Sequence, residues 1–296
     1  MRANIQGRVS EKVSNGLLRM SHWAQATLHG FQGPATLSAQ EDEIISNLTN
    51  EGVHVIPVER LFPDLAAKLH DSFVRVADFI AQESVHASSP SLKRRGGSTD
   101  LRSEELLRSF PEIYLLGLDS RIISLAEHYF GLPVAYHGAA LRQSFVDGHQ
   151  LGPRLWHMDS EDFHVLRVVI YLSDVTPGCG PFEYIPRSSG LSYKAFPGIE
   201  SITNEQMRTV VTDDQWKRCF GPVGTVILAD SAKIFHHESL QVERSRTVAM
   251  IGYSSRRPKG MHLATSHFPV ESVMPELTSL LSPQQHPYVI GWRRTV

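Results

Sequence analysis

The sequence is poor in cysteine, in net charge and in long apolar runs. Its 296 residues include two cysteines, Cys179 and Cys219, and carry a formal net charge of -2. Two cysteines cannot build a disulfide framework, so we expect both to be free thiols in a reducing compartment. The near-zero charge argues against nucleic acid as a partner, because such binding needs a basic surface. No stretch approaches the roughly 18 apolar residues of a membrane span, so we expect no membrane association.

The N-terminal segment MRANIQGRVSEK lacks the apolar stretch of a secretory signal, which favours a cytoplasmic protein. The composition is globular: 41% of the residues are hydrophobic and 20% charged, which allows one large domain with a well-buried core. We expect residues 39–296 to form a single domain. An extension over 1–38, which shows no sustained periodicity and is expected to wrap around the domain or to hang free of it, precedes it. No sequence feature sets the oligomeric state.

Helices are predicted for the first part of that domain, residues 40–132. The clearest lies over 62–84, where apolar residues recur at spacings of three and four. Another runs over 119–130, with Asp119 as its N-cap and Gly131 at its end. The remaining predictions in this part are a short helix over 40–50, an extended stretch over 53–58 and a loop over 88–100.

After Pro133 the pattern changes to short apolar runs separated by turn clusters such as VDGHQLGP and DVTPGCGP. Many short strands with few helices between them indicate an antiparallel sandwich or barrel. The predicted strands are 134–137, 141–146, 154–158, 165–172, 181–186, 223–229 and 246–253. We therefore expect a mainly β protein with flanking helices, whose barrel occupies about 133–260 and is followed by a C-terminal segment over 261–296.

Two potential metal ligands, His157 and Asp159, stand at the end of a predicted strand in the stretch RLWHMDSEDFH. Side chains two residues apart on a strand point to the same side, whereas on a helix they would diverge by about 200°. A histidine and a carboxylate that converge in this way supply two of the three ligands of a 2-His-1-carboxylate iron(II) site, which leaves positions open for oxygen chemistry. The motif alone is short enough to occur by chance, and a solvated polar loop is the simpler alternative.

The segment GTVILADSAKIFHHESLQVERSRTVAMIGY, at 224–253, supplies further polar groups. It is typical of a strand, a turn with His236 and His237, a polar hairpin and a strand that opens with Arg246. Adjacent residues of an extended chain point apart, so we expect one of the two histidines to be a ligand. An arginine that faces the same cavity would bind the far carboxylate of a dicarboxylate. A polar turn and a surface charge explain each residue singly, but they explain the whole set less well.

The ordered set His157-x-Asp159, His236 and Arg246 resembles the phytanoyl-CoA dioxygenase-like family of Fe(II)/2-oxoglutarate-dependent oxygenases. Three further stretches are similar to family segments: LDSRIISLAEHYFGLPV (118–134) to the helix before the barrel, VIYLSDVTPGCGPFEYIPRSS (169–189) to a strand followed by a Gly-Pro turn, and DSAKIFHHE (230–238) to the segment of the distal histidine.

The resemblance covers about residues 40–255 and implies a double-stranded β-helix, or jelly-roll barrel, flanked by helices. It also implies that His157, Asp159 and His236 hold Fe(II), with His236 selected over its neighbour because an aromatic residue precedes it. The co-substrate 2-oxoglutarate would chelate the metal and place its distal carboxylate on Arg246, and dioxygen would react at the metal. The implied outcome is hydroxylation of an unactivated C–H bond of a small molecule, a secondary or specialised metabolite, with release of succinate and CO2.

The chain departs from the family pattern in places. The sequence Pro186-Arg187-Ser188-Ser189 stands where relatives often have PGSH, and Val248 stands where relatives carry a hydroxyl for the 2-oxoglutarate carboxylate. We expect Tyr171 to replace that hydroxyl, with a core aromatic as the alternative. Lys93 is a further candidate for the 2-oxoglutarate carboxyl end, because a residue from this region has that role in some relatives.

Further candidates line the pocket or its rim. Arg142 and Ser144 share one face of the stretch LRQSFV and are candidates for substrate binding. For these two residues and for Lys93, a solvated or structural role is the alternative. Glu161 would point to the same side as Asp159 and is a candidate for substrate contact, although a surface position is the alternative. We expect Ser160, Asp162 and His164 at the surface or rim, and His237 behind the metal ligands or at the rim. The resemblance is weak over 190–220, where such enzymes usually build substrate-specific lids.

Several reactions stay open at this point. The intact Asp159 argues against halogenating relatives, in which a small residue leaves room for a halide on the metal. Desaturation, epimerisation and ring formation use the same cofactors as hydroxylation. An alternative of another class is a non-catalytic barrel that binds a small molecule or a metal. A zinc hydrolase is a third possibility, but it lacks an evident general base and leaves Arg246 unexplained.

Overall fold

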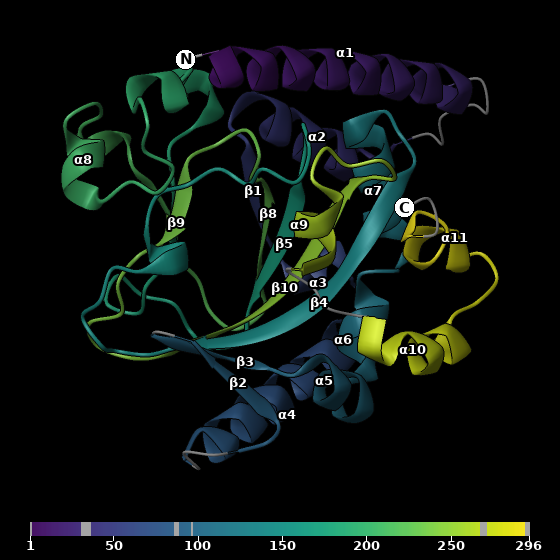
Figure 1. Ribbon diagram of the computed structural model, residues 1–296. Coiled ribbons are helices and arrows are strands. Elements are labelled where there is room, and N and C mark those ends of the chain that lie inside the picture. The colour runs from purple at the N-terminus through teal and green to yellow at the C-terminus, as the bar shows by residue number, and fades with distance from the viewer. Residues whose placement is uncertain (1, 31–36, 86–88, 96, 267–270, 294–296) are drawn as a thin grey trace.

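Two antiparallel sheets face each other in the computed structural model, which describes residues 2–30, 37–85, 89–95, 97–266 and 271–293 (Figure 1). The larger sheet has seven strands in the order β1-β8-β5-β10-β4-β3-β2, and the smaller has three in the order β7-β6-β9. The strands are β1 (Val53–Pro57), β2 (Leu92–Arg95), β3 (Ser98–Leu101), β4 (Val134–Ser144), β5 (Leu166–Tyr171), β6 (Phe182–Tyr184), β7 (Lys217–Cys219), β8 (Thr225–Asp230), β9 (His236–Glu238) and β10 (Arg246–Ser255).

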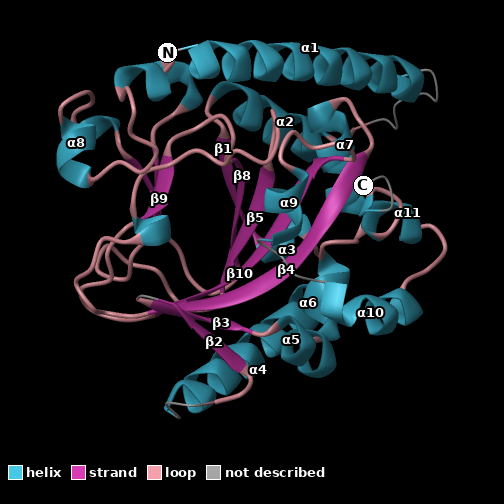
Figure 2. Cartoon of the chain, in the orientation of Figure 1, coloured by secondary structure: helices cyan, strands magenta, loops and turns pink. Residues whose placement is uncertain are grey.

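Most helices pack on the outer face of the larger sheet and around its ends, whereas α8 (Asn204–Arg208) lies beside the smaller sheet (Figure 2). They are α1 (Arg2–Gly30), α2 (Ala39–Asn50), α3 (Val58–Leu61), α4 (Ala66–Val85), α5 (Ser103–Ser109), α6 (Pro111–Leu116), α7 (Ser120–Phe130), α8 (Asn204–Arg208), α9 (Met261–Ser266), α10 (Met274–Leu280) and α11 (His286–Val289). In the part of the chain that the structure describes, no helix is both long and apolar enough to span a membrane.

Because side chains alternate in direction along each strand, the two faces of the larger sheet pack into two different apolar clusters. On β5, Val168 and Ile170 belong to the large cluster that packs against the helices, whereas Val169 and Tyr171 face the smaller sheet together with Val248 of β10. This double-sided burial explains why 165–172 is the most apolar predicted strand. The predicted mainly β fold with flanking helices, a jelly-roll barrel, is confirmed.

The barrel recruits strands from the part of the chain predicted to be helical, so the predicted boundary at 133 is wrong for the sheet. The extended stretch at 53–58 forms β1, which pairs with β8. The predicted loop over 88–100 contains the hairpin β2–β3, which pairs with β4 through β3. Charged residues on β2 fit its place as an edge strand. Residues 88 and 96 of that predicted loop lie outside the described residues.

The N-terminal extension contains α1, a helix of 29 residues. Among its contacts, His22 Nε2 lies 3.0 Å from the Arg257 carbonyl oxygen, and the Arg19 guanidinium lies 4.5 Å from the centre of the Phe163 ring. Large apolar side chains such as Trp23 point instead to solvent. Over 14–28, where the side chains of α1 are described, none is fully buried, so this part of the helix has no buried apolar stripe to give the sequence a period. Residues 31–36 of the predicted extension, and 267–270 and 294–296 of the predicted C-terminal segment, lie outside the described residues.

Local predictions near the site had mixed outcomes. The helix predicted over 119–130 is α7, with Asp119 accepting a hydrogen bond from the Arg121 amide and Gly131 in the left-handed conformation. The helix predicted over 62–84 begins later, at Ala66. The strand predicted over 154–158 is wrong: a short 3-10 turn ends at Arg154, and isolated bridges tie the next residues to other segments. Both predicted free cysteines are free and buried.

Candidate metal centre

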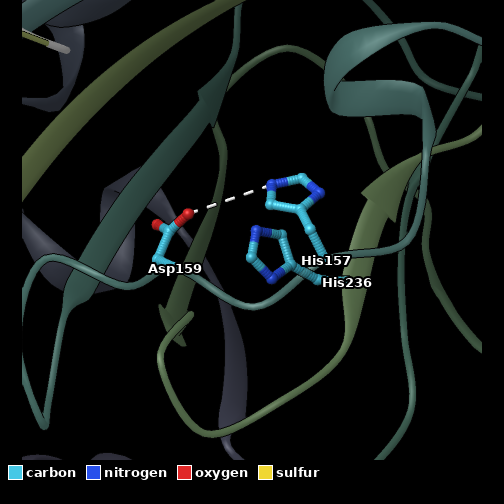
Figure 3. Close-up of side chains that lie close together, drawn as sticks. All are labelled: His157, Asp159 and His236. Atoms are coloured by element: carbon cyan, nitrogen blue, oxygen red, sulfur yellow. Dashed lines mark ion pairs between the residues drawn. The ribbon is translucent and has the colours of Figure 1, made fainter. Parts of the chain in front are cut away.

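Three side chains from two distant segments converge at one end of the space between the sheets (Figure 3). His157 forms an isolated antiparallel bridge with His236, the first residue of β9, and the two backbones exchange hydrogen bonds of 3.0 and 3.1 Å. The Asp159 amide donates to the Ser231 carbonyl at 2.9 Å, just beyond β8. One potential ligand atom from each of the three side chains lies within 4.8 Å of the other two. We call these three residues the metal cluster.

Backbone carbonyls orient both imidazoles. Nδ1 of His157 lies 2.8 Å from the Leu155 carbonyl oxygen, and Nδ1 of His236 lies 3.4 Å from that of Ile234. Because a carbonyl only accepts, each Nδ1 is the protonated nitrogen, and Nε2 keeps its lone pair for a metal. Burial, followed by the nearby His157, lowers the pKa of His236 to about 3. A neutral imidazole is the form that binds metal.

Asp159 is held as a carboxylate. Its Oδ2 accepts from Arg167 Nε at 2.8 Å and from Ser231 Oγ at 2.7 Å, while Oδ1 lies 3.9 Å from His157 Nε2 (Figure 3). Burial raises the pKa of Asp159, but the Arg167 charge and the other partners outweigh it and hold the pKa well below its usual range. Two imidazoles and one fixed carboxylate are the donor set that suits non-haem iron(II).

Arg167 was not singled out in the sequence, and it connects the metal cluster to Glu161. Its Nη2 forms a close ion pair with the Glu161 carboxylate, so one guanidinium bridges two carboxylates. Glu161 is fully buried and Asp162 is 3% exposed, so the expected surface position of both acids is wrong. Asp162 instead accepts a hydrogen bond from the Ser255 amide at 3.0 Å. The signal that was available for Arg167 is a single charge within the most apolar strand.

His164 and His237, the two further histidines near the proposed ligands in sequence, point away from the metal cluster. His237 is 1% exposed, stacks on Trp156 with ring centres 3.9 Å apart, and bonds the Glu183 carboxylate at 2.8 Å. His164 bonds Asp230 at 2.6 Å and is partly exposed. The expectation that one of the paired histidines joins His157 therefore agrees with this geometry, but His237 is buried rather than at the rim.

Arg246 lies on the inner face of β10 and is engaged by groups of this chain. Its Nη2 donates to Glu238 at 2.5 Å and its Nη1 to the Gly180 carbonyl at 2.5 Å. Both Arg246 and Glu238 are almost fully buried. Glu238 was not singled out in the sequence, although it lies only two residues beyond His236. The guanidinium is thus buried in the barrel but already neutralised.

The other residues predicted at the co-substrate site share one row across the larger sheet. Lys93 pairs with Asp100, Asp100 with Arg142, Arg142 with Val248, and Val248 with Tyr171, so all five lie on the same face. Arg142 Nε and Nη2 donate to the two oxygens of Asp100 at 2.6 and 3.2 Å. We call Arg142, Asp100, Arg246 and Glu238 the arginine cluster.

Tyr171 and Ser144 are buried next to the arginine cluster, whereas Lys93 is exposed. The Tyr171 hydroxyl donates to the Cys219 carbonyl at 2.8 Å and accepts from the Phe182 amide at 3.0 Å. These bonds connect β5 to the smaller sheet. Ser144 is the direct strand neighbour of Arg246. The structure therefore brings these residues to one region, and their roles in binding stay predictions.

Solved structures with similar folds include three whose proteins were crystallised with ligands or metals. HygX from Streptomyces hygroscopicus, with nickel and 2-oxoglutarate bound, is 15% identical with a TM-score of 0.51, covering 74% of this chain and 88% of that chain. EctD from S. alaskensis, with 2-oxoglutarate and 5-hydroxyectoine, is 19% identical with a TM-score of 0.51, covering 77% and 81%. The epimerase SnoN, in complex with Fe3+, alpha ketoglutarate and nogalamycin RO, is 14% identical with a TM-score of 0.52, covering 76% and 89%.

Neither a protein-family model nor a curated protein matches the chain. The structural likenesses show that the chain shares the fold of these three proteins.

Proposed function

We propose that this protein is an Fe(II)- and 2-oxoglutarate-dependent oxygenase that hydroxylates an unactivated C–H bond of a small molecule, and that it is a member of the phytanoyl-CoA dioxygenase-like family. The observation that carries the proposal is the convergence of His157, Asp159 and His236 within 4.8 Å, with Arg246 buried between the same two sheets. A barrel that only binds a small molecule would not need a buried carboxylate held beside two imidazoles.

The residues of the metal cluster would hold the iron through two Nε2 atoms and one carboxylate oxygen. When bound, iron and 2-oxoglutarate would supply an oxidant from dioxygen, with succinate and CO2 released. Arg167 and Ser231 hold Asp159 by one oxygen and leave the other free to face the metal. Arg246 would bind the distal carboxylate of 2-oxoglutarate, with Lys93 and Tyr171 as further candidates near its carboxyl end.

The substrate would enter beside the segment after β6, which packs over the metal cluster. Tyr193 accepts a hydrogen bond from the Met158 amide at 3.0 Å, between the two ligands His157 and Asp159, and donates to the Glu200 carbonyl at 3.0 Å. Residues of this segment, including Trp216, form an apolar cluster together with Trp156. This arrangement supports a lid that contacts the substrate and sets its position over the metal.

Epimerisation is the second candidate reaction, because the epimerase SnoN shares the fold and was solved with Fe3+ and alpha ketoglutarate. Desaturation and ring formation are the other outcomes of the same chemistry. The position of the substrate C–H bond decides between them. The intact Asp159 favours all of these over halogenation.

The proposal is tested by incubation of the protein with Fe(II), 2-oxoglutarate, ascorbate and oxygen, with succinate as the readout. A panel of small-molecule candidates is included, because substrate accelerates turnover in such enzymes. We expect succinate above the level of an Asp159→Ala control, which loses a ligand while Arg167 keeps its ion pair with Glu161; thermal unfolding checks that this control is folded. Absence of succinate across the panel, together with absence of iron binding, would exclude the oxygenase and favour a non-catalytic barrel.

A further inference from the structure

A buried carboxylate in the arginine cluster has no part in the proposed reaction. Glu238 is 7% exposed and lies on β9, two residues after the proposed ligand His236. Its Oε2 accepts from Arg246 Nη2 at 2.5 Å. It therefore occupies the guanidinium that the distal carboxylate of 2-oxoglutarate would bind.

Both terminal nitrogens of Arg246 already donate to groups of this chain. Nη1 donates to the Gly180 carbonyl and Nη2 to Glu238, whereas Nε has no hydrogen-bond partner among the described residues. Three of the five N–H groups of the guanidinium are therefore left, but a strong carboxylate contact on arginine uses two parallel N–H groups of one edge. With Glu238 in place, an incoming carboxylate would meet a guanidinium whose charge is already neutralised, beside a buried like charge.

Glu238 is a firmly held anion with partners besides Arg246. Its Oε1 accepts from Gln241 Nε2 at 2.6 Å and lies 3.5 Å from Arg154 Nε. The carboxylate would keep Gln241 and Arg154 if it gave up Arg246.

We propose that Glu238 is a resident competitor for Arg246 and weakens the binding of any co-substrate that carries a distal carboxylate. This inference rests on the proposed function. Binding of 2-oxoglutarate exchanges one buried ion pair for another, while Glu238 stays bonded to Gln241 and Arg154. Affinity for the co-substrate is therefore set by this exchange and not by an open cationic site.

The test is calorimetry of two 2-oxo acids binding to the nickel-loaded chain, in wild type and in Glu238→Gln. Nickel binds imidazole and carboxylate donors, and the readout does not depend on turnover. 2-Oxoglutarate carries a distal carboxylate, whereas pyruvate lacks it. Glutamine keeps the shape and removes the charge. We expect the Kd of 2-oxoglutarate to fall about tenfold, which is about 1.4 kcal/mol, and the Kd of pyruvate to stay the same.

A matched control is Glu183→Gln. Glu183 is also a buried carboxylate on the smaller sheet, but it pairs with His237 and Arg218 instead of Arg246. We expect the ratio of the two Kd values in this variant to equal that of wild type. If thermal unfolding shows that Glu238→Gln does not fold, Glu238→Asp serves, because its shorter side chain draws the carboxylate away from Arg246 and shifts the ratio in the same direction.

Three results separate the possibilities. Unchanged or weaker 2-oxoglutarate binding by a folded Glu238 variant would overturn the inference, since Glu238 would then hold Arg246 in place for the co-substrate. An equal change for pyruvate would also overturn it, because the effect would not act through the distal carboxylate. If wild type shows no metal-dependent binding of either 2-oxo acid, the proposed function fails, and the inference fails with it.

Discussion

The metal cluster and the arginine cluster lie in the same barrel but differ in how their charges are satisfied. In the metal cluster, the protein holds one carboxylate oxygen and both Nδ1 atoms and leaves the remaining lone pairs facing one point. In the arginine cluster, each cation is already paired: Arg246 with Glu238, and Arg142 with Asp100. The first cluster is prepared for a ligand, whereas the second must exchange an internal partner for one.

This difference explains why the two clusters respond differently to substitution. Removal of a histidine of the metal cluster takes away a bond to the ion and leaves the fold with one polar group fewer. Removal of one member of a buried ion pair leaves the other charge without a partner, which is far more costly for the fold. The substitutions below test this difference.

The largest effect is expected from a comparison of the two single variants His236→Ala and His237→Ala. The first variant loses a proposed ligand, so metal affinity should fall by more than about 100-fold, beyond the range seen for residues behind the ligands. The second loses a stacked histidine that faces Trp156 and Glu183, so it should keep one metal ion per chain. Equilibrium dialysis with Fe(II) under anaerobic conditions measures both. Loss of metal in the His237 variant alone would reverse the assignment.

The next effect concerns the free energy of unfolding. Arg246→Met leaves Glu238 buried without its main partner, and breaking such a pair costs about 3–5 kcal/mol. The double variant Arg246→Met with Glu238→Gln should recover much of that loss, because no unpaired charge remains. Urea unfolding of the single and double variants gives the coupling energy. Strictly additive effects would show that the pair is not coupled in solution.

Acid should distinguish the two clusters in the metal-free protein. The pKa of His236 in the folded chain, about 3, lies below the unfolded value of roughly 6.5, so between these pH values the unfolded chain binds the extra proton. Stability therefore falls as the pH drops below about 6.5, by about 1.4 kcal/mol per pH unit. Glu238 has a lowered pKa, so the stability it contributes is present above roughly pH 4.3 and is lost only at lower pH.

The measurement is the unfolding free energy of wild type minus that of His236→Gln between pH 7 and pH 4.5. We expect this difference in unfolding free energy to decrease as the pH is lowered from 7 to 4.5, because the variant lacks the buried imidazole. A difference that stays constant over this range would show that His236 is not held neutral.

The smallest effect is expected behind the metal cluster. Arg167→Lys keeps a charge between Asp159 and Glu161 but loses the fork that binds both, so metal affinity should fall about tenfold. Arg167→Met should fall further and also lose stability, because two buried carboxylates would then face each other. Anaerobic Fe(II) titration and urea unfolding separate these effects. Tighter metal binding by either variant would show that Arg167 competes with the metal for Asp159.

The sequence predicted the elements whose signals are local. α7 has its cap at Asp119 and its left-handed glycine at 131, and the apolar run at 165–172 became β5. The two-residue spacing of His157 and Asp159 predicted that their side chains lie on one side, which they do, although isolated bridges hold this segment instead of a regular strand. The pairing with His236 came from the family resemblance and not from spacing.

The sequence failed where burial depends on distant partners. A surface position was the alternative for Glu161, because no sequence pattern around it identifies Arg167 as its ion-pair partner. The polar hairpin β2–β3 looked like a loop, because its edge position is defined only by pairing with β4. In the part of α1 whose side chains the structure describes, no apolar stripe faces the protein, so apolar residues do not recur with a helical period in its sequence. Ion pairs that close in three dimensions leave no trace in spacing.

Anomalous diffraction at the iron edge, on crystals grown anaerobically with Fe(II), tests the proposed metal site. We expect one iron atom bonded to Nε2 of His157, Nε2 of His236 and a carboxylate oxygen of Asp159, and no peak there in an Asp159→Ala crystal. Iron bound elsewhere, or a metal that persists at this place without Asp159, would exclude the proposed site.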